Sequence, residues 1–518
     1  MRKVRSPALR GVVMLTATGI FSQALGFFYR IALSRLIGAE VLGLYQLIMP
    51  VYSVLLSLTS IGLTAAVSNL SARYQAVGNT RGVWELRQQA LGLFFLLATP
   101  PCLLLALGSD AVSVILGDAR TQLGLILLIP CFLLTGIENL QKHYFYGVGF
   151  VRPAALTELA EQVIRTGAVL GLLAAFLPQG GEKAVGLILV GMIVSEIFSA
   201  ILQTFLFRRH LGPVGALRGS APTAGAMRRQ IGQIAFPVGI TALLGNLIGA
   251  VNSAIIPRLL VKSGMEVTKA MESFGVMFGM TLPMLFLPTC FLGALNLVLL
   301  PRLAESSALG QEKSVRRRLK KAFSAANLLL IPSLALLAVV GPQLGVVLYR
   351  DDRAGDYMAL LAVGVLFSCW QTLLSNALNG LDRSGSAAAV ALLTDGVQLA
   401  LTYCTVGKYG LEGFVWGYVV TSALGAWLCW RVLSRETGLS LPVFDWFMAP
   451  VLGALLAAFC TRLLYCHLLA KGVPLLAGGL SSLLFGIILY LAALQAMGIS
   501  IRGLWGDEKG LAPRGKRR

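Results

Sequence analysis

The chain has 518 residues, of which 56% are hydrophobic and only 13% are charged, whereas charged residues make up about a quarter of a typical soluble domain. Apolar runs that reach the roughly 20 residues needed to cross a bilayer recur along the whole sequence. This composition excludes a soluble enzyme, a secreted disulfide-rich scaffold and a disordered chain. The sequence therefore predicts an all-α polytopic membrane protein.

Apolar runs separated by charged or Pro/Gly-rich breaks predict about fourteen membrane-spanning helices. The first run follows a basic N-terminal segment without a cleavage site, so we expect it to be retained as a helix. The predicted spans are residues 10–37, 43–70, 88–108, 121–141, 153–177, 184–207, 230–256, 272–299, 322–341, 357–378, 386–405, 412–433, 446–467 and 474–497.

The formal net charge of +20 reflects basic side chains in the short loops between apolar runs. Most of these Lys and Arg residues fall on the side that carries both termini, and this asymmetry predicts that both termini are cytoplasmic. We expect the run 316–321 and the C-terminal tail to contact anionic lipid headgroups. The placement of the charges in membrane loops argues against a nucleic-acid partner.

The sequence also repeats itself. Without a gap, Ala72–Leu116 aligns with Ala304–Leu348, and the matched pairs include Gly78 with Gly310 and Pro100 with Pro332. Six helices per copy give both copies the same orientation, with the working site expected between them. The predicted organisation is a six-helix lobe (1–207), a basic cytoplasmic linker (208–229), a second six-helix lobe (230–433), two further helices (434–498) and a basic cytoplasmic tail (499–518).

One face of the first span carries small and polar residues that include Gln23 and Arg30. An arginine inside a span is costly unless it faces protein or a water-filled cavity. Its guanidinium cannot lose its proton and matches phosphate oxygens in a bidentate manner. We therefore predict that Arg30, with Gln23 and Arg35, binds a phosphorylated substrate in a central cavity. Snorkelling to the interface, or pairing with an acid of the span 153–177, is the structural alternative.

The span 153–177 carries Glu158, Glu161 and Arg165 on one stripe. Glu161 and Arg165 are spaced for an ion pair within the helix, which would lower the cost of burying both. Internal neutralisation is therefore one interpretation of this stripe. The alternative is that all three residues line the cavity and that an acid changes protonation during transport.

Polar residues of the second lobe are candidates for substrate or ion contacts. Asn246 lies in the span 230–256 and is predicted to face the cavity. Asp395, Gln398 and Thr402 share a face of the span 386–405 and are candidates for coupling to Na⁺ or H⁺. Helix–helix hydrogen bonding explains the neutral residues equally well.

No phosphate-binding GxxxxGK[ST] loop is present, so pumping would be driven by a gradient rather than by ATP. The eight cysteines and three histidines show no metal-ligand spacing. We expect no catalytic residues and no cofactor or metal centre, apart from Na⁺ or H⁺ as a coupling ion.

The segments GFFYRIALSRLIGAE (26–40), LGLYQL (42–47), ELAEQVIR (158–165) and LFLPT (285–289) resemble the stage V sporulation protein B group. This group belongs to the polysaccharide-transporter family of the multidrug/oligosaccharidyl-lipid/polysaccharide (MOP) exporter superfamily and is related to lipid II flippases. The resemblance covers nearly the whole chain. It implies a MATE-like V shape of two six-helix lobes in a bacterial plasma membrane.

The same resemblance implies flipping of an undecaprenyl-pyrophosphate-linked glycan precursor, with cell-wall synthesis enzymes as partners. Relatives commonly place an arginine at the position of Gln23. Lipid II flippases carry an Arg-Asp pair where Tyr29 and Arg30 stand, and a cavity arginine near Pro283. The cavity is therefore expected to be less cationic, which leaves other glycans open. A cation-coupled multidrug exporter and a non-transporting membrane scaffold for wall synthesis are the alternatives.

Overall fold

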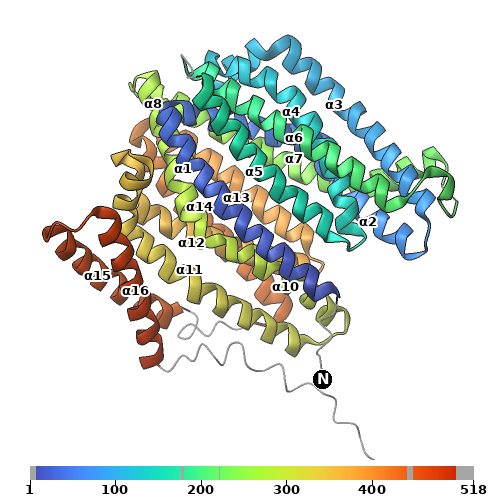
Figure 1. Cartoon of the computed structure of the whole chain (residues 1–518). Coiled ribbons are helices and arrows are strands. Elements are labelled where there is room, and N and C mark those ends of the chain that lie inside the picture. The colour runs from blue at the N-terminus through green and yellow to red at the C-terminus, as the bar shows by residue number, and fades with distance from the viewer. Residues whose placement is uncertain (1–6, 177–179, 221, 440–446, 498–518) are drawn as a thin grey trace, which may run out of the picture. The chain divides into compact units, whose positions relative to one another are not determined.

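The computed structural model describes residues 7–176, 180–220, 222–439 and 447–497. These residues are almost entirely helical, and no strand occurs among them (Figure 1). The α-helices are α1 (Pro7–Leu56), α2 (Gly62–Ala76), α3 (Thr80–Leu116), α4 (Gln122–Gly147), α5 (Val151–Phe176), α6 (Gly181–Leu211), α7 (Ala224–Lys262), α8 (Val267–Gly275), α9 (Leu282–Phe286), α10 (Cys290–Ala308), α11 (Glu312–Tyr349), α12 (Met358–Gly380), α13 (Ser384–Tyr409), α14 (Leu411–Thr437), α15 (Ala449–Ala470) and α16 (Leu475–Ala496).

Thirteen helical segments of the described chain are long and apolar enough to cross a membrane. The first of them, Ala17–Ala76, contains two predicted spans, because α1 continues past the break expected between residues 37 and 43. The backbone turns at Gly38, whose φ of 76° and ψ of 177° lie outside the helical region and are readily adopted only by glycine. With this segment counted as two, the predicted set of spans and the all-α polytopic class are confirmed.

The described helices form two compact units. Unit 1 comprises Met1–Leu287 and Ala391–Gly417, and unit 2 comprises Pro288–Val390 and Tyr418–Arg518. The boundaries of these units differ from the predicted lobe boundaries. The six-helix lobes at 1–207 and 230–433 therefore stay a prediction. Of the predicted linker 208–229, only residues 212–223 lie outside α6 and α7. The tail 499–518 lies outside the described residues.

Two turns, one in each unit, have the same local geometry and support the internal repeat. After α3, the Asp118 side chain accepts a hydrogen bond from the backbone N–H of Arg120 (2.9 Å) and another from its guanidinium (2.7 Å). After α11, Asp351 accepts from the N–H of Arg353 (2.9 Å) and from its guanidinium (2.9 Å). Each aspartate is the N-cap of a short 3₁₀ helix that contains the arginine. The two copies therefore share a loop structure as well as a sequence pattern.

Within unit 2, α15 and α16 pack against each other and against α11. A small core joins them, in which Ala457 and Tyr490 are buried beside Ile331. The Tyr490 hydroxyl donates to the Leu328 carbonyl (3.2 Å). The two helices outside the repeat are thus attached to the third helix of the second copy.

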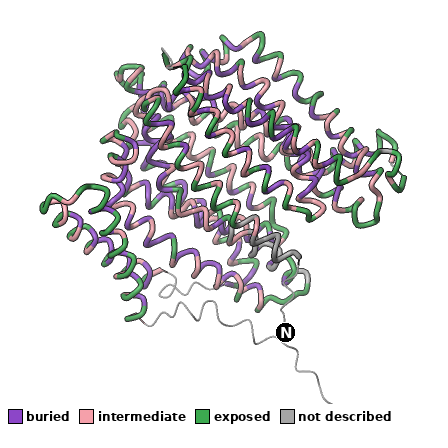
Figure 2. Tube along the Cα trace, viewed as in Figure 1, coloured by how far each residue is buried: buried purple, intermediate pink, exposed green. Residues whose placement is uncertain are grey.

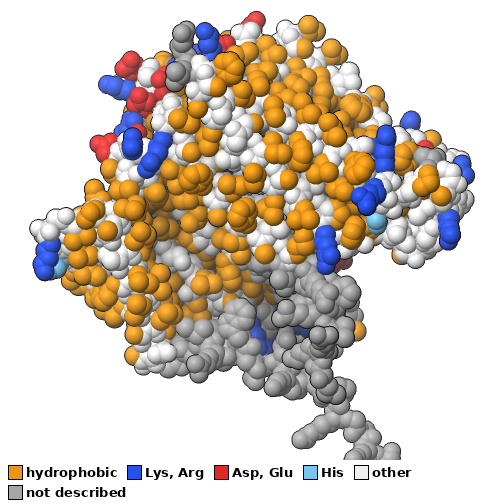
Figure 3. All heavy atoms as spheres, in the orientation of Figure 1, with side chains coloured by type: hydrophobic (Ala, Val, Ile, Leu, Met, Phe, Trp, Pro, Cys, Tyr) orange, Lys and Arg blue, Asp and Glu red, His pale blue; other side chains and the backbone are white. Residues whose placement is uncertain are grey.

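Burial follows the pattern expected for helices in lipid. In unit 1 the buried residues line the contacts between neighbouring helices, and the outward faces are exposed (Figure 2). Those outward faces are largely hydrophobic in the view of Figure 3, where Lys and Arg side chains lie toward the margins. Exposed leucines such as Leu97 and Leu107 on α3 belong to this apolar surface. A helix surface of this kind is stable in hydrocarbon and unstable in water.

Candidate functional site

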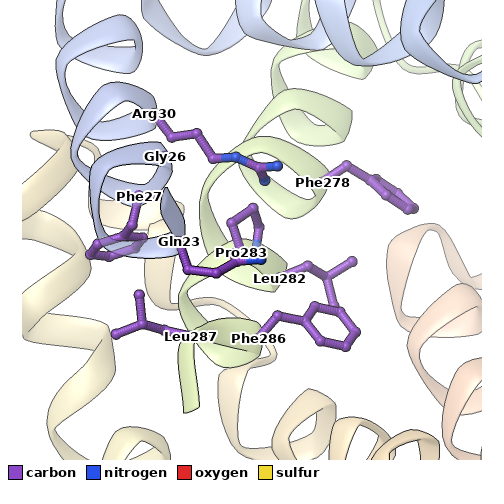
Figure 4. Close-up of a pocket in the computed structure, with 9 residues that line it drawn as sticks. All are labelled: Gln23, Gly26, Phe27, Arg30, Phe278, Leu282, Pro283, Phe286 and Leu287. Atoms are coloured by element: carbon purple, nitrogen blue, oxygen red, sulfur yellow. The ribbon is translucent and has the colours of Figure 1, made fainter. Parts of the chain in front are cut away.

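A pocket of about 420 Å³ lies within unit 1, between the first half of α1 and the segment from α8 to α9 (Figure 4). The α1 side contributes polar and aromatic residues at helical spacing. The opposite side begins in a π-helical turn, Val276–Thr281, that connects α8 to α9. The lining residues are Gln23, Gly26, Phe27, Arg30, Phe278, Leu282, Pro283, Phe286 and Leu287. Apart from Gln23 and Arg30 the lining is glycine, proline and hydrophobic side chains.

Arg30 is the charged group of this lining. Its side chain is exposed, and Figure 4 shows its guanidinium extending from α1 toward the α8–α9 side of the pocket. Within the described part of the chain, no acid forms an ion pair with it. The acids that the structural alternative assigned to it, Glu158 and Glu161, have other partners. The guanidinium is therefore available to an anionic ligand.

Gln23 lies two turns before Arg30 on the same face and completes the polar part of the pocket. Gly26 stands between them, and a side chain there would approach the amide of Gln162 on α5 at 3.6 Å. Arg35, the third residue predicted for this site on α1, is exposed but does not line the pocket. The structure thus brings together two of the three α1 residues that the sequence singled out.

Glu161 and Arg165 form the ion pair that their spacing predicts, but in the interior of the α4–α5–α6 bundle and not in the pocket lining. Arg165 also donates to the Glu196 carboxylate on α6 (2.7 Å) and to the Ser195 hydroxyl (3.3 Å). The Ser199 hydroxyl donates to the second oxygen of Glu161 (3.3 Å). Arg165 therefore links two carboxylates from neighbouring helices.

A second ion pair extends this network along α4. The Lys142 ammonium lies 3.0 Å from a Glu138 oxygen and 4.0 Å from a Glu158 oxygen. The Tyr146 hydroxyl donates to the same Glu158 oxygen (3.2 Å). The Glu158 side chain is half exposed, whereas that of Glu138 is 2% exposed. Glu158 therefore lies at the open edge of a network whose other charged members are buried or partly buried.

Sequence reasoning missed Glu138, Lys142 and Glu196. Glu138 and Glu196 are charged residues inside predicted spans, as Glu161 is, and Lys142 directly follows the predicted span 121–141. Glu138, Glu161 and Glu196 each place an oxygen within 4.8 Å of the other two, a spacing that a cation could bridge. Arg165 already supplies a cation between two of them. Arg165 and Lys142 thus offset part of the negative charge of the carboxylates in this network, and a buried charge needs such partners.

The remaining predicted residues lie elsewhere in unit 1 and not in the pocket lining. Asn246 is partly buried on α7. On α13, the Gln398 amide donates to the Thr402 hydroxyl (3.3 Å), and Thr402 is fully buried. Asp395 is exposed one turn before Gln398. Along this stripe of α13, Asp395 is therefore exposed and Thr402 is buried.

The aromatic half of the pocket was also missed as a site. Phe278, Leu282 and Phe286 come from the π-helical turn and α9, where the sequence shows only an apolar run. Nothing in hydrophobic periodicity distinguishes a lipid-facing phenylalanine from one that lines a pocket. Two features noted above as part of the family resemblance overlap this region: the motif LFLPT (285–289), and Pro283, near which lipid II flippases carry a cavity arginine.

Comparison with known proteins identifies the family. The model of the family "Polysaccharide biosynthesis protein" matches residues 8–307, and that of "Lipid II flippase MurJ" matches residues 168–496. Each match covers more than half of the chain. Stage V sporulation protein B of Bacillus subtilis is 24% identical over 454 residues, covering 85% of this chain and 86% of the relative. Lipid II flippase MurJ of the same species is 19% identical over 467 residues, covering 85% and 84%.

Solved structures show the same fold. An inward closed structure of the lipid II flippase MurJ has a TM-score of 0.68 at 14% identity, covering 94% of this chain and 98% of the other. An inward-facing multidrug resistance MATE family transporter has a TM-score of 0.64 at 14% identity, covering 82% and 99%. The described chain is thus a multi-pass membrane protein with the fold of MOP superfamily transporters, and it belongs to the polysaccharide biosynthesis protein family and to the related lipid II flippase family.

Proposed function

We propose that the protein is a gradient-driven flippase for an undecaprenyl-pyrophosphate-linked glycan precursor, working by alternating access. The observation that carries the proposal is the unpaired Arg30 guanidinium in an otherwise largely apolar pocket of about 420 Å³. A planar guanidinium binds phosphate oxygens through two parallel hydrogen bonds.

The apolar side of the pocket suits the other part of such a substrate. Phe27, Phe278 and Phe286 present aromatic surface close to Arg30. An isoprenoid chain next to the phosphate would bury apolar area there, worth roughly 25 cal/mol per Å². A single cation beside aromatic and aliphatic side chains therefore matches an amphiphile with an anionic linkage. The glycan is the transported group, and the proposal assigns no pocket residue to it.

The test is flipping of a fluorescent undecaprenyl-pyrophosphate-linked sugar by purified protein in liposomes. We expect Arg30→Ala to abolish flipping while the protein remains folded, because it removes an anchor and no packing. The matched control is Arg462→Ala, which removes an exposed arginine from α15 of unit 2. Equal flipping by Arg30→Ala and wild type would refute the proposal.

Coupling to Na⁺ or H⁺ is part of the proposal, with Asp395, Gln398 and Thr402 as the candidate ion site. The Gln398–Thr402 hydrogen bond and the exposed carboxylate of Asp395 one turn away support it. Flipping driven by an imposed Na⁺ gradient or an imposed pH gradient, each without the other, tells the two ions apart.

A cation-coupled multidrug exporter is the second candidate, favoured by the fold shared with MATE transporters. A site for organic cations would need an acid, and the described pocket lining contains Arg30 and no acid. Export of a cationic dye by proteoliposomes, unaffected by undecaprenyl pyrophosphate, would favour the exporter. A scaffold for wall-synthesis enzymes would move neither substrate.

We further propose that the protein lies in a bacterial plasma membrane with both termini in the cytoplasm. The basic run of α11 would then meet anionic headgroups. Part of that run is occupied, since Arg316 donates to the Thr437 carbonyl and Arg318 lies 3.7 Å from Glu305. Protease access to tags on both termini in inverted vesicles tests this orientation.

A further inference from the structure

A cluster of aromatic rings lies in unit 1, where the start of α3 meets the end of α6. The Trp84 and Phe207 rings stack with 6.2 Å between their centroids. Phe207 is buried and also packs edge-on against Tyr144 of α4, with 4.8 Å between the centroids. The Tyr144 hydroxyl and the His210 Nδ1 share a hydrogen bond of 2.8 Å. These contacts fix the position of the Phe207 ring.

Arg87 of α3 lies over this aromatic cluster. Its guanidinium carbon is 4.9 Å from the Phe207 centroid and 5.9 Å from the Trp84 centroid, distances at which a ring attracts a cation. The Arg87 Nε is buried and has no hydrogen-bond partner. The nearest acid in sequence, Glu85, accepts a hydrogen bond from Gln89 instead (2.7 Å). Within the part of the chain that the structure describes, no acid forms an ion pair with Arg87.

A second arginine without an acidic partner lies near the first. Arg208 of α6 is exposed, and its positive charge repels that of Arg87. Among the described residues, none forms an ion pair with the Arg208 side chain either. Two like charges that lie close together raise the energy of the folded state unless an anion is bound near both. The pair of arginines is therefore suited to an anionic ligand.

Arg208 ends an apolar stripe on the outward face of α6. Residues three, four and seven positions apart share one face of a helix. Five hydrophobic residues at this spacing precede Arg208 and are all exposed, namely Val194, Ile197, Phe198, Ile201 and Phe205. An exposed apolar stripe that ends beside two cations matches an amphiphile with acyl chains along the helix and a negative headgroup at its end.

The position of both arginines along their helices agrees with a lipid ligand. Arg87 directly precedes the predicted span 88–108, and Arg208 directly follows the predicted span 184–207. The charge distribution predicts that these two span ends face the cytoplasm. Tryptophan is enriched at this level of a membrane, and Trp84 lies beside Arg87. In Figure 3, Lys and Arg side chains lie at the margin where Figure 1 places the turn between α2 and α3.

We propose that Arg87 and Arg208 bind the phosphate of an anionic phospholipid from the cytoplasmic leaflet, whose acyl chains lie on the apolar stripe of α6. A guanidinium donates two parallel hydrogen bonds to a phosphate group, and two guanidinium groups on different helices hold one phosphate between them. The lipid thereby connects α3 to α6, both of which pack on α4. Neither arginine lines the pocket with Gln23 and Arg30, so the inference does not depend on the proposed flippase function.

The test is native mass spectrometry of the full-length protein in detergent. Phosphatidylglycerol and phosphatidylcholine with the same acyl chains are added at equal concentrations. We expect wild type to retain phosphatidylglycerol in preference to phosphatidylcholine, and Arg87→Gln with Arg208→Gln to reduce the phosphatidylglycerol-bound fraction at least fivefold. Where this double variant yields no folded protein, Arg208→Gln alone should reduce the fraction at least twofold, since that exposed side chain can be replaced without loss of packing.

Arg73→Gln with Arg81→Gln is the matched control, because it removes the same charge from two exposed arginines on either side of the α2–α3 turn. We expect this control to retain phosphatidylglycerol as wild type does. An equal loss in both double variants would overturn the site, since it would show that only the overall charge of this surface attracts the lipid. Equal retention of the two lipids by wild type would also overturn it. Displacement of the lipid by millimolar inorganic phosphate would identify free phosphate as the ligand and overturn the assignment to a lipid.

Discussion

The Arg165 guanidinium donates a hydrogen bond to the Glu196 carboxylate at 2.7 Å and so joins α5 to α6 inside unit 1. The Glu196 side chain is 2% exposed, and Arg165 also pairs with Glu161 on its own helix. The Glu161–Arg165 pair, which the sequence predicts within one helix, therefore belongs to a network that also joins α5 to α6. The network connects α4, α5 and α6, and α5 also packs against α1, the helix that carries Arg30.

We expect Arg165→Ala to destabilise the protein strongly. Removing one partner of a buried ion pair costs about 3–5 kcal/mol, because it leaves a buried charge without compensation. Thermal unfolding in detergent should show this loss. Replacing Arg165 by Met together with Glu161→Gln and Glu196→Gln should recover much of the stability. A single Arg165→Ala variant as stable as wild type would contradict the role given to the network.

Arg30 should behave in the opposite way, with lost activity and retained stability. Arg30→Lys keeps the charge but not the bidentate fork, so we expect flipping to fall about tenfold in place of vanishing, the equivalent of about 1.4 kcal/mol. Initial rates in liposomes measure this difference. Adding Glu161→Gln to Arg30→Ala should not restore flipping, because Glu161 is paired with Arg165. Recovery in that double variant would show that Arg30 balances an acid.

Asp395→Asn tests the proposed ion coupling. The exposed carboxylate near the Gln398–Thr402 hydrogen bond should be needed for gradient-driven flipping but not for substrate binding. We expect the rate under an imposed gradient to drop at least tenfold, with the substrate dissociation constant changed less than twofold. Glu412→Gln, in the first turn of α14, is the control. An unchanged flipping rate would show that the Asp395 carboxylate has no part in ion coupling.

The turn after α11 predicts a dependence of stability on pH. Burial alone would raise the pKa of Asp351, but the hydrogen bonds and the charge of Arg353 outweigh it and hold this pKa below its usual value of 3.8. A lowered pKa in the folded state means that the turn contributes stability above pH about 4. That contribution disappears as the pH falls through the lowered pKa.

Asp351→Asn should therefore destabilise unit 2 at pH 7, and this effect should fade as the pH falls through the lowered pKa of Asp351. The expected loss at pH 7 is about 0.5–2 kcal/mol, as for an aspartate that caps a helix. Hydrogen exchange of residues 349–358 at several pH values measures it. The neighbouring Asp352→Asn is the control, since that side chain is exposed. A loss of stability that does not depend on pH would show that the substitution acts through the shape of the side chain and not through the charge of Asp351.

Local pattern was sufficient for the membrane class, the spans, the repeat and the Glu161–Arg165 pair. Span length follows from bilayer thickness, and an i, i+4 pair follows from helix geometry, so both are present in a linear sequence. The same reasoning singled out Gln23 and Arg30, because polar residues recur on one face of a hydrophobic helix. The alternative in which Arg30 pairs with an acid of α5 could not be decided from that pattern.

Tertiary structure alone decided which charges meet. Glu196 lies 31 residues beyond Arg165, so their contact depends on how α6 packs on α5. The same holds for Phe278 and Arg30, which line one pocket because a π-helical turn and a kinked helix bring distant segments together. The sequence shows where a small residue allows two helix backbones to approach closely, as at Gly43 and Gly275. Packing selects the partner, because side-chain contacts between helices are set by helix rotation and register, for which a single sequence carries no periodic signal.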